Sequence, residues 1–177
     1  MKPIPITDEM KKSARRADTR IMRTFKKKNG NYTSLSEPDR FYTGVLGELA
    51  FLELLKQNNI KAKYAPTWNN LADKGDVVVY CNDYPLKVDI KTSGKAFHKN
   101  LWLPEKQYNR YNYNGYVGVR LVDDVAEIHG YCSKDDFTKS EHSGAKVPTW
   151  GIGLDELREI DKLFARLDKG ETLIVLP

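Results

Sequence analysis

The residues best suited to chemistry lie in one stretch of the chain, residues 75–93. Two runs of β-branched and aromatic residues, separated by the turn formers at 82–83, predict the two strands of a hairpin. Side chains alternate between the two faces of a strand, so Asp89 and Lys91 are expected on the same face of the second strand. A carboxylate and an ammonium group would then lie side by side.

Two further carboxylates are expected near this pair. Asp76 opens the first strand of the hairpin, and Glu48 lies upstream in a segment whose pattern is helical. Mg²⁺ takes hard oxygen ligands, usually one or two carboxylates together with water and substrate phosphate, so the convergence suits a Mg²⁺ site. The helix is largely apolar, and a buried Glu48 without a partner would be costly. A metal ion or a lysine would supply that partner; the alternative is that Glu48 lies at an exposed edge.

A third signal follows the hairpin. Gln107 and Tyr111 are four residues apart in a helix predicted over residues 104–113, and residues at that spacing share a helix face. The ordered set is Gly-x-x-Gly-Glu48, Gly-Asp76, Asp89-x-Lys91 and Gln107-x-x-x-Tyr111. Over roughly residues 38 to 130, this order resembles the PD-(D/E)XK nuclease superfamily. The last motif is similar to that of RecB-like members. The first helix lacks the histidine those members usually carry and looks more like that of Holliday-junction resolvases and restriction endonucleases.

The resemblance implies a Mg²⁺-dependent DNA nuclease, an endonuclease or an exonuclease, with Mn²⁺ able to substitute for Mg²⁺. We expect an endonuclease that acts in DNA repair, recombination or restriction. Asp76, Asp89 and the Ile90 carbonyl would hold the metal, together with Glu48. Lys91 would orient the attacking water or neutralise charge in the transition state, and Gln107 would complete the catalytic set. Two alternatives stay open: an inactive nucleic-acid-binding module of the same fold, and an RNA-directed nuclease.

Charge is concentrated at the start of the chain. The protein carries a net +5, but residues 1–30 alone hold ten Lys or Arg against three Asp or Glu, a net of +7 that leaves −2 for the rest. The pattern from Thr7 to Lys28 predicts a helix with one apolar stripe. Its other side is either a solvated basic face or a nucleic-acid surface, because neutralising phosphates releases counterions. The residues expected there are Arg15, Arg16, Arg20 and Arg23.

Two other segments have a composition that suits nucleic acid. Residues 93–100 mix basic, small and aromatic side chains, and Lys95 and Lys99 are expected to lie against a phosphate backbone; the same composition is ordinary for a surface loop. Tyr111 belongs to a cluster of tyrosines that would either stack on unpaired bases or pack in the core.

The element pattern predicts an α/β fold with a restriction-endonuclease-like core. We expect a central mixed β-sheet of about four to five strands flanked by helices. A basic N-terminal helix would occupy residues 1–30, and a single nuclease-like domain residues 31–177. Strands are expected at 61–64, in the hairpin, at 116–122, 125–131 and 172–176, and helices at 38–57, 104–113 and 154–167, with 133–150 irregular.

Composition places the chain in the class of soluble globular proteins. It has no apolar run of membrane-spanning length and no signal-peptide pattern, so a cytoplasmic location is the default expectation. Cys81 and Cys132 lie far apart without metal-ligand spacing and are expected to be buried thiols rather than a zinc site or a disulfide. Cutting both strands of DNA would favour a symmetric homodimer.

Overall fold

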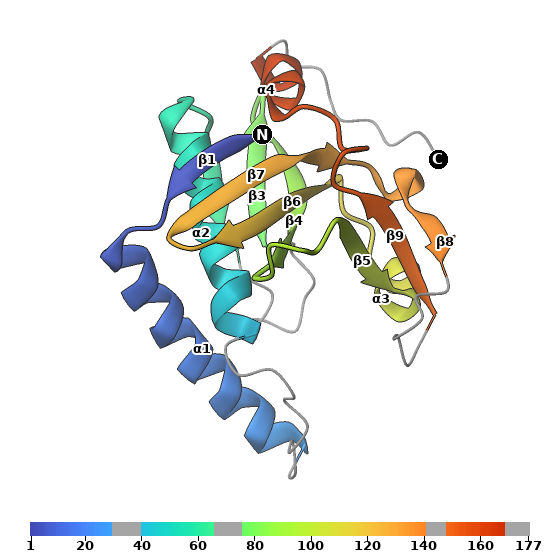
Figure 1. Ribbon diagram of the computed structural model, residues 1–177. Helices are drawn as coiled ribbons and strands as arrows, with labels where there is room; N and C mark the ends of the chain where they lie inside the picture. The colour runs from blue at the N-terminus through green and yellow to red at the C-terminus, as the bar shows by residue number, and fades with distance from the viewer. Residues whose placement is uncertain (30–39, 66–75, 141–147, 169–177) are drawn as a thin grey trace.

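A mixed β-sheet forms the centre of the structure (Figure 1). The computed structural model describes residues 1–29, 40–65, 76–140 and 148–168. In that part of the chain, six strands pair in the order β1 (Lys2–Pro5), β7 (Val125–Cys132), β6 (Gly115–Val122), β4 (Tyr84–Ser93), β3 (Val77–Cys81) and β2 (Ala62–Tyr64). All neighbours are antiparallel except β4 and β6, which are parallel. The predicted mixed sheet flanked by helices is confirmed, with six strands in place of four or five.

One long helix covers the main sheet, and a second long helix packs on the first. The helix α2 (Arg40–Gln57) contacts the strands, and α1 (Asp8–Asn29) packs on α2 and extends past the edge of the sheet (Figure 1). Thr7 caps α1, because its Oγ1 accepts the Met10 amide at 3.2 Å,. Ala14 and Ile21 are buried, which confirms the apolar stripe over this part of α1.

A second, smaller sheet lies beside the first (Figure 1). It pairs β5 (Asn100–Pro104), β9 (Thr149–Gly153) and β8 (Thr138–Ser140), all antiparallel. The connection between β4 and β6 contains β5 and the short helix α3 (Glu105–Arg110), because parallel neighbours require a long crossover. This crossover carries Gln107. The second sheet shares an apolar cluster with β6 and β7: Leu101, Leu103, Tyr113, Tyr116, Cys132, Phe137, Ile152, Leu154 and Leu157.

Several expectations for the C-terminal half are wrong. Residues 133–150 are not irregular throughout, because they contain the short helix η2 (Lys134–Asp136), β8 and the start of β9. The helix predicted from residue 154 begins only at Ile160, as α4 (Ile160–Asp168), since Leu154 and Leu157 instead pack into the second cluster. The helix predicted over 104–113 ends at Arg110. The strand predicted at 172–176 lies outside the described residues.

The strands β1 and β5 are further elements that the sequence pattern misses. β1 contains Pro3 and Pro5 and forms one edge of the main sheet beside β7; an edge is where a strand tolerates proline. The predicted buried thiols are confirmed, because Cys81 and Cys132 are both buried and neither forms a disulfide within the described residues. Burial raises the pKa of Cys132 to about 12. Among the described helices, none combines the length and apolarity needed to cross a bilayer.

Candidate active site

The candidate site forms where β3 and β4 part. Their antiparallel ladder reaches Val77 opposite Val88, and past Val88 strand β4 continues along β6. Asp76 immediately precedes β3. Its side-chain Oδ2 accepts a hydrogen bond from the Ile90 amide at 2.8 Å, as a backbone carbonyl of a paired strand would. A buried amide needs such an acceptor. The side chain of Asp76 is therefore held against the backbone of the strand that carries the other two charged residues.

Asp89 and Lys91 lie on one face of β4, as predicted from the strand alternation. Asp89 is 5 % exposed, and its Oδ2 lies 2.7 Å from Lys91 Nζ. The contact is an ion pair, since Oδ2 is buried and makes no hydrogen bond of good geometry with any described group. Gln107 reaches the same ammonium from α3, with Lys91 Nζ donating to its Oε1 at 3.4 Å. Residues from the predicted hairpin and from the helix predicted over residues 104–113 thus meet at one cation.

Glu48 approaches from α2. It is 8 % exposed, so the alternative of an exposed edge is wrong. Its Oε2 accepts the hydroxyl of Tyr64 in β2 at 2.6 Å. The preceding residue, Gly47, lets α2 lie close to β4, because a Cβ there would overlap the side chain of Thr92. Sequence reasoning missed Tyr64, whose role depends on the pairing of β2 with β3 and has no local signal.

The carboxylates share one poorly solvated space. Burial raises the pKa of Asp76 well above its usual value, and repulsion from Asp89 and Glu48 raises it further, against the opposing Ile90 amide and Lys91. Burial also raises the pKa of Glu48, with a further contribution from Asp89, while the Tyr64 hydroxyl and Lys91 lower it. Asp76 and Glu48, both with raised pKa values, lie with Asp89 around a single ammonium, and such a site would gain stability from an added cation.

The donor set fits Mg²⁺. In the described ranges, no three His, Cys, Asp or Glu side chains are arranged so that they could hold a metal ion by themselves. Mg²⁺ keeps several waters and is usually bound by one or two carboxylates together with substrate phosphate, so partial coordination by protein is what it needs. The groups best placed to supply it are the carboxylate of Asp76 and the buried Asp89 Oδ2, for which no hydrogen bond is found within the described part of the chain.

The residues predicted to contact nucleic acid fall into three groups. Arg15, Arg16, Arg20 and Arg23 are exposed on α1, with the Arg15 guanidinium 3.8 Å from the centre of the Tyr42 ring. Lys95 and Lys99 are exposed in the segment that follows β4. Tyr111 lies just past α3, half-buried, with its ring 5.8 Å from that of Tyr113. It packs beside the second apolar cluster.

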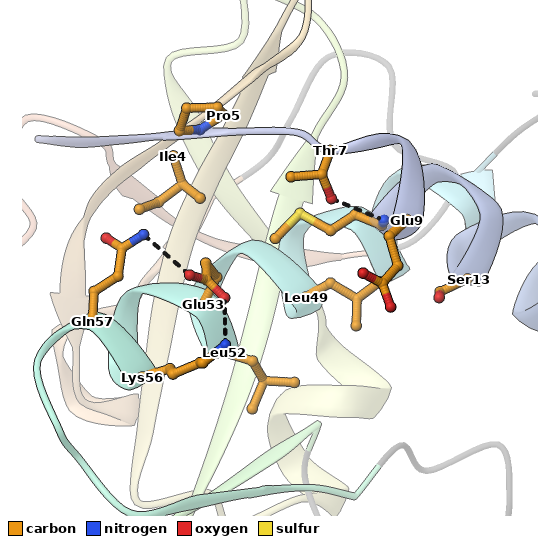
Figure 2. A pocket seen from close by; sticks show the side chains of 11 residues that line it. Ile4, Pro5, Thr7, Glu9, Ser13, Leu49, Leu52, Glu53, Lys56 and Gln57 are labelled. Carbon is orange, nitrogen blue, oxygen red and sulfur yellow. Dashed lines mark hydrogen bonds and ion pairs between the residues drawn. The ribbon is translucent and has the colours of Figure 1, made fainter.

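A separate pocket of about 560 Å³ lies between β1, the start of α1 and α2 (Figure 2). Its lining includes Ile4, Met10 and Leu49, and Glu53, which accepts a hydrogen bond from Gln57 at 3.3 Å. None of the five candidate catalytic residues lines it. We therefore place the candidate chemistry at the parting of β3 and β4 and not in this pocket.

Comparison with known proteins gives little beyond this geometry. No protein-family model matches the sequence, and no curated protein matches it. Among solved structures, the chain is similar to a bacterial homing endonuclease, I-Ssp6803I, at 15 % identity and a TM-score of 0.45, over 76 % of this chain and 95 % of that one. This likeness is too distant to assign an activity, so the functional argument rests on the site itself.

Proposed function

We propose that this protein is a Mg²⁺-dependent deoxyribonuclease that hydrolyses phosphodiester bonds, acting as an endonuclease in repair, recombination or restriction. The observation that carries the proposal is the placement of Lys91, which lies 2.7 Å from Asp89 and 3.4 Å from Gln107. The Lys91 ammonium is also close enough to Asp76 and Glu48 to lower the pKa of each carboxyl group. A structural ion pair needs only one carboxylate, so the additional buried acids support the proposal that the site takes an added cation.

Asp76, Asp89 and the Ile90 carbonyl are the groups that would hold Mg²⁺, with Mn²⁺ as a substitute and Glu48 close by in the same buried space. When bound, the ion would supply positive charge for the scissile phosphate and make a water molecule more acidic. The protein's own contribution is to fix these oxygens before substrate arrives. The Ile90 amide holds Asp76, the Tyr64 hydroxyl holds Glu48, and the parallel pairing with β6 holds the Asp89 backbone.

Lys91 has a role that does not depend on metal coordination. Its ammonium is only partly exposed, with 23 % of the side chain accessible, and Gln107 limits where it can point. A cation held in this way can donate to a phosphate oxygen or orient the attacking water as negative charge develops on the phosphate. Gln107 acts through Lys91 and is a positioning residue.

The exposed arginines of α1, together with Lys95 and Lys99, would contact DNA phosphates away from the reacting centre. Such contacts supply affinity without sequence preference. If both strands of a duplex are cut, a homodimer would place a second site on the opposite strand, in keeping with the prevalence of twofold oligomers.

The test is cleavage of a labelled panel containing linear duplex, single strand, flap, four-way junction and RNA, with Mg²⁺, Mn²⁺ or EDTA. We expect cutting of DNA with either metal, none with EDTA, and loss of most cutting in Lys91→Ala. Lys87→Ala, which changes an exposed lysine of the same strand, is the matched control and should cut normally. Tight DNA binding without cutting under any metal would instead indicate the inactive binding module, and preference for RNA would indicate the RNA-directed nuclease.

A further inference from the structure

Strand β4 leads directly from the candidate active site to an exposed aromatic ring. Six residues after Lys91, Phe97 is 73 % exposed, more than any other large apolar side chain in the described ranges. Exposing a phenylalanine to water costs hydrophobic free energy, and a lone exposed ring is not unusual. The reason to consider Phe97 further is the structure that holds it.

The backbone around Phe97 is fixed at several points. The Ser93 hydroxyl accepts the Lys95 amide at 3.2 Å, and the His98 amide donates to the Lys95 carbonyl at 3.1 Å, which closes a turn. Arg120 Nη1 donates to the Ala96 carbonyl at 3.2 Å. This segment, residues 94–99, is therefore anchored on both sides of the ring, and we call it the 94–99 turn.

Arg120 and Lys99 tie the turn to the rest of the fold. Arg120 belongs to β6, and its Nε and Nη2 lie 2.8 Å and 2.7 Å from Glu127 Oε2, so its guanidinium is already oriented when it contacts the turn. The Lys99 carbonyl accepts the Leu154 amide at 2.7 Å. The turn is thus held against both the main sheet and the second sheet.

The ring itself is also positioned. Phe97 packs edge-to-face on His98, with ring centres 4.9 Å apart and planes at 90°, a favoured aromatic geometry. His98 is in turn held by Ser93, whose Oγ lies 2.7 Å from His98 Nδ1. His98 supports the ring through its edge contact, while most of Phe97 remains open to solvent.

Exposed lysines lie near this ring in the sequence, and one of them lies near it in space. Lys95 and Lys99 are exposed on either side of it along the chain, and Lys95 Nζ lies 5.9 Å from the ring centre. A flat apolar surface with one ammonium beside it and a second exposed lysine two residues along the chain suits a nucleotide, in which a flat base is linked to charged phosphates. Proteins that bind single strands combine such a basic surface with aromatic side chains on which bases stack.

We propose that Phe97 is a stacking platform for an unpaired nucleobase, so that the protein binds DNA with unpaired bases more tightly than continuous duplex. The ligand class rests on the proposed nuclease function, whereas the platform rests on the 94–99 turn. In a continuous duplex each base is already stacked on its neighbours and cannot reach the ring. Lys95 and Lys99 would bind the phosphates that flank the unpaired base.

The test measures binding of the full-length protein in EDTA, where no metal-dependent cutting occurs. The probes are an end-labelled duplex that contains one unpaired aminopurine, a fluorescent base analogue, and the continuous duplex of the same sequence. We expect Phe97→Ala to raise Kd for the bulged probe about tenfold, within the range measured for base–aromatic stacking, and to leave Kd for continuous duplex nearly unchanged. Stacking should also quench the aminopurine with wild type and not with Phe97→Ala.

Matched variants separate stacking from other effects. Phe97→Trp should keep both the affinity and the quenching, and Phe97→Leu should lose both, because it keeps apolar contact without an aromatic face. Tyr84→Ala removes an exposed aromatic, 62 % accessible, from the opposite end of β4 and should behave as wild type. Lys95→Gln should reduce the salt dependence of binding, whereas Phe97→Ala should leave it unchanged.

Ser93 provides a test of ring positioning. Ser93→Ala should lose part of the preference for the bulged probe and part of the quenching, while Ser93→Thr, which keeps a hydroxyl, should restore both. A merely structural role of Ser93 would lower thermal stability without changing the ratio of the two Kd values.

Equal binding of wild type and Phe97→Ala to both probes would overturn the proposal, as would an equal loss on both. It would also fail if wild type did not prefer the bulged probe, and Phe97 would then be assigned to a contact with another protein. These outcomes are distinct from failure of the nuclease proposal. A protein that quenches aminopurine through Phe97 but cuts nothing with Mg²⁺ would keep the platform and lose the nuclease, and Mg²⁺-dependent cutting without quenching would do the reverse.

Discussion

Replacing Tyr64 by Phe removes one hydroxyl and, with it, the hydrogen bond that Tyr64 donates to Glu48 Oε2 at 2.6 Å. Glu48 is 8 % exposed, so water does not readily replace the lost donor. Hydrogen bonds to charged groups contribute about 1.5–3 kcal/mol to stability, and those between neutral groups about 0.5–1.5 kcal/mol. We therefore expect Tyr64→Phe to lower the free energy of unfolding by about 2 kcal/mol near neutral pH.

The cost should depend on pH in a defined direction. The pKa of Glu48 in the folded protein is raised above its ordinary value of 4.5, mainly by burial, and the Tyr64 hydroxyl opposes that rise. The folded protein therefore holds this proton more tightly than the unfolded chain, and stability falls as pH rises from 4.5 through the folded pKa,. Without the hydroxyl the folded pKa rises further and stability falls more. Below 4.5 the carboxyl is protonated in both states, and only a neutral hydrogen bond is lost.

Urea unfolding of the metal-free protein at neutral pH and at a pH below 4.5 measures both costs. Tyr80→Phe, on the neighbouring strand β3, is the matched control, because no hydrogen bond of its hydroxyl is found among the described residues. The reasoning is refuted if Tyr64→Phe costs the same at both pH values, or no more than Tyr80→Phe at neutral pH.

Three further predictions concern stability and binding. Asp76→Asn should stabilise the metal-free protein near neutral pH by about 1 kcal/mol, because burial and repulsion raise the pKa of Asp76. The gain should vanish below pH 3.8, where the carboxyl group is neutral in both the folded and the unfolded state,. Thermal melts over a pH series would measure it. Gly47→Ala should lower the free energy of unfolding by about 1–3 kcal/mol through overpacking, whereas Gly44→Ala should raise it by about 0.5–1 kcal/mol. The reason is that only the Cβ added at Gly47 would meet a neighbour among the described residues. Denaturant unfolding of both variants tests this, and similar free energies of unfolding would contradict it. The double variant Arg16→Gln/Arg20→Gln should make the slope of log Kd against log salt concentration for duplex DNA shallower by about 1.8, because each lost phosphate contact reduces the slope by about 0.9. An unchanged slope would show that α1 is only a solvated basic face.

The positions of the candidate site residues could be predicted where they depend on the local sequence pattern. Strand alternation alone places Asp89 and Lys91 on one face, and the hairpin brings Asp76 to the same end of β4, because both follow from the order of residues within one stretch. Glu48 was predictable because a carboxylate within an apolar helix needs a partner. Gln107 was assigned to the catalytic set through the resemblance that the order of the motifs carries, whereas its contact with Lys91 depends on how α3 packs and was not predicted.

The parts that the sequence did not reveal depend on contacts between distant segments. Tyr64 reaches Glu48 only because β2 pairs with β3 in one register, and a short strand carries no signal of its register. Leu154 and Leu157 fit a helical spacing, yet they pack beneath the second sheet, where Gly118 leaves room for them. The positioning of Phe97 requires the Ser93–His98 contact and the Arg120 anchor, which neither composition nor periodicity indicates.

Metal affinity and single-turnover cleavage, measured together for Asp89→Asn and Lys91→Ala, test the central claim most directly. Mn²⁺ binding can be followed by electron paramagnetic resonance, with Lys87→Ala as the control. We predict that Asp89→Asn loses both binding and cleavage, while Lys91→Ala retains Mn²⁺ binding and cleaves about 10²- to 10³-fold more slowly, the scale expected when one stabilising group is removed. Cleavage by Lys91→Ala at the wild-type rate would contradict the assignment of the active site.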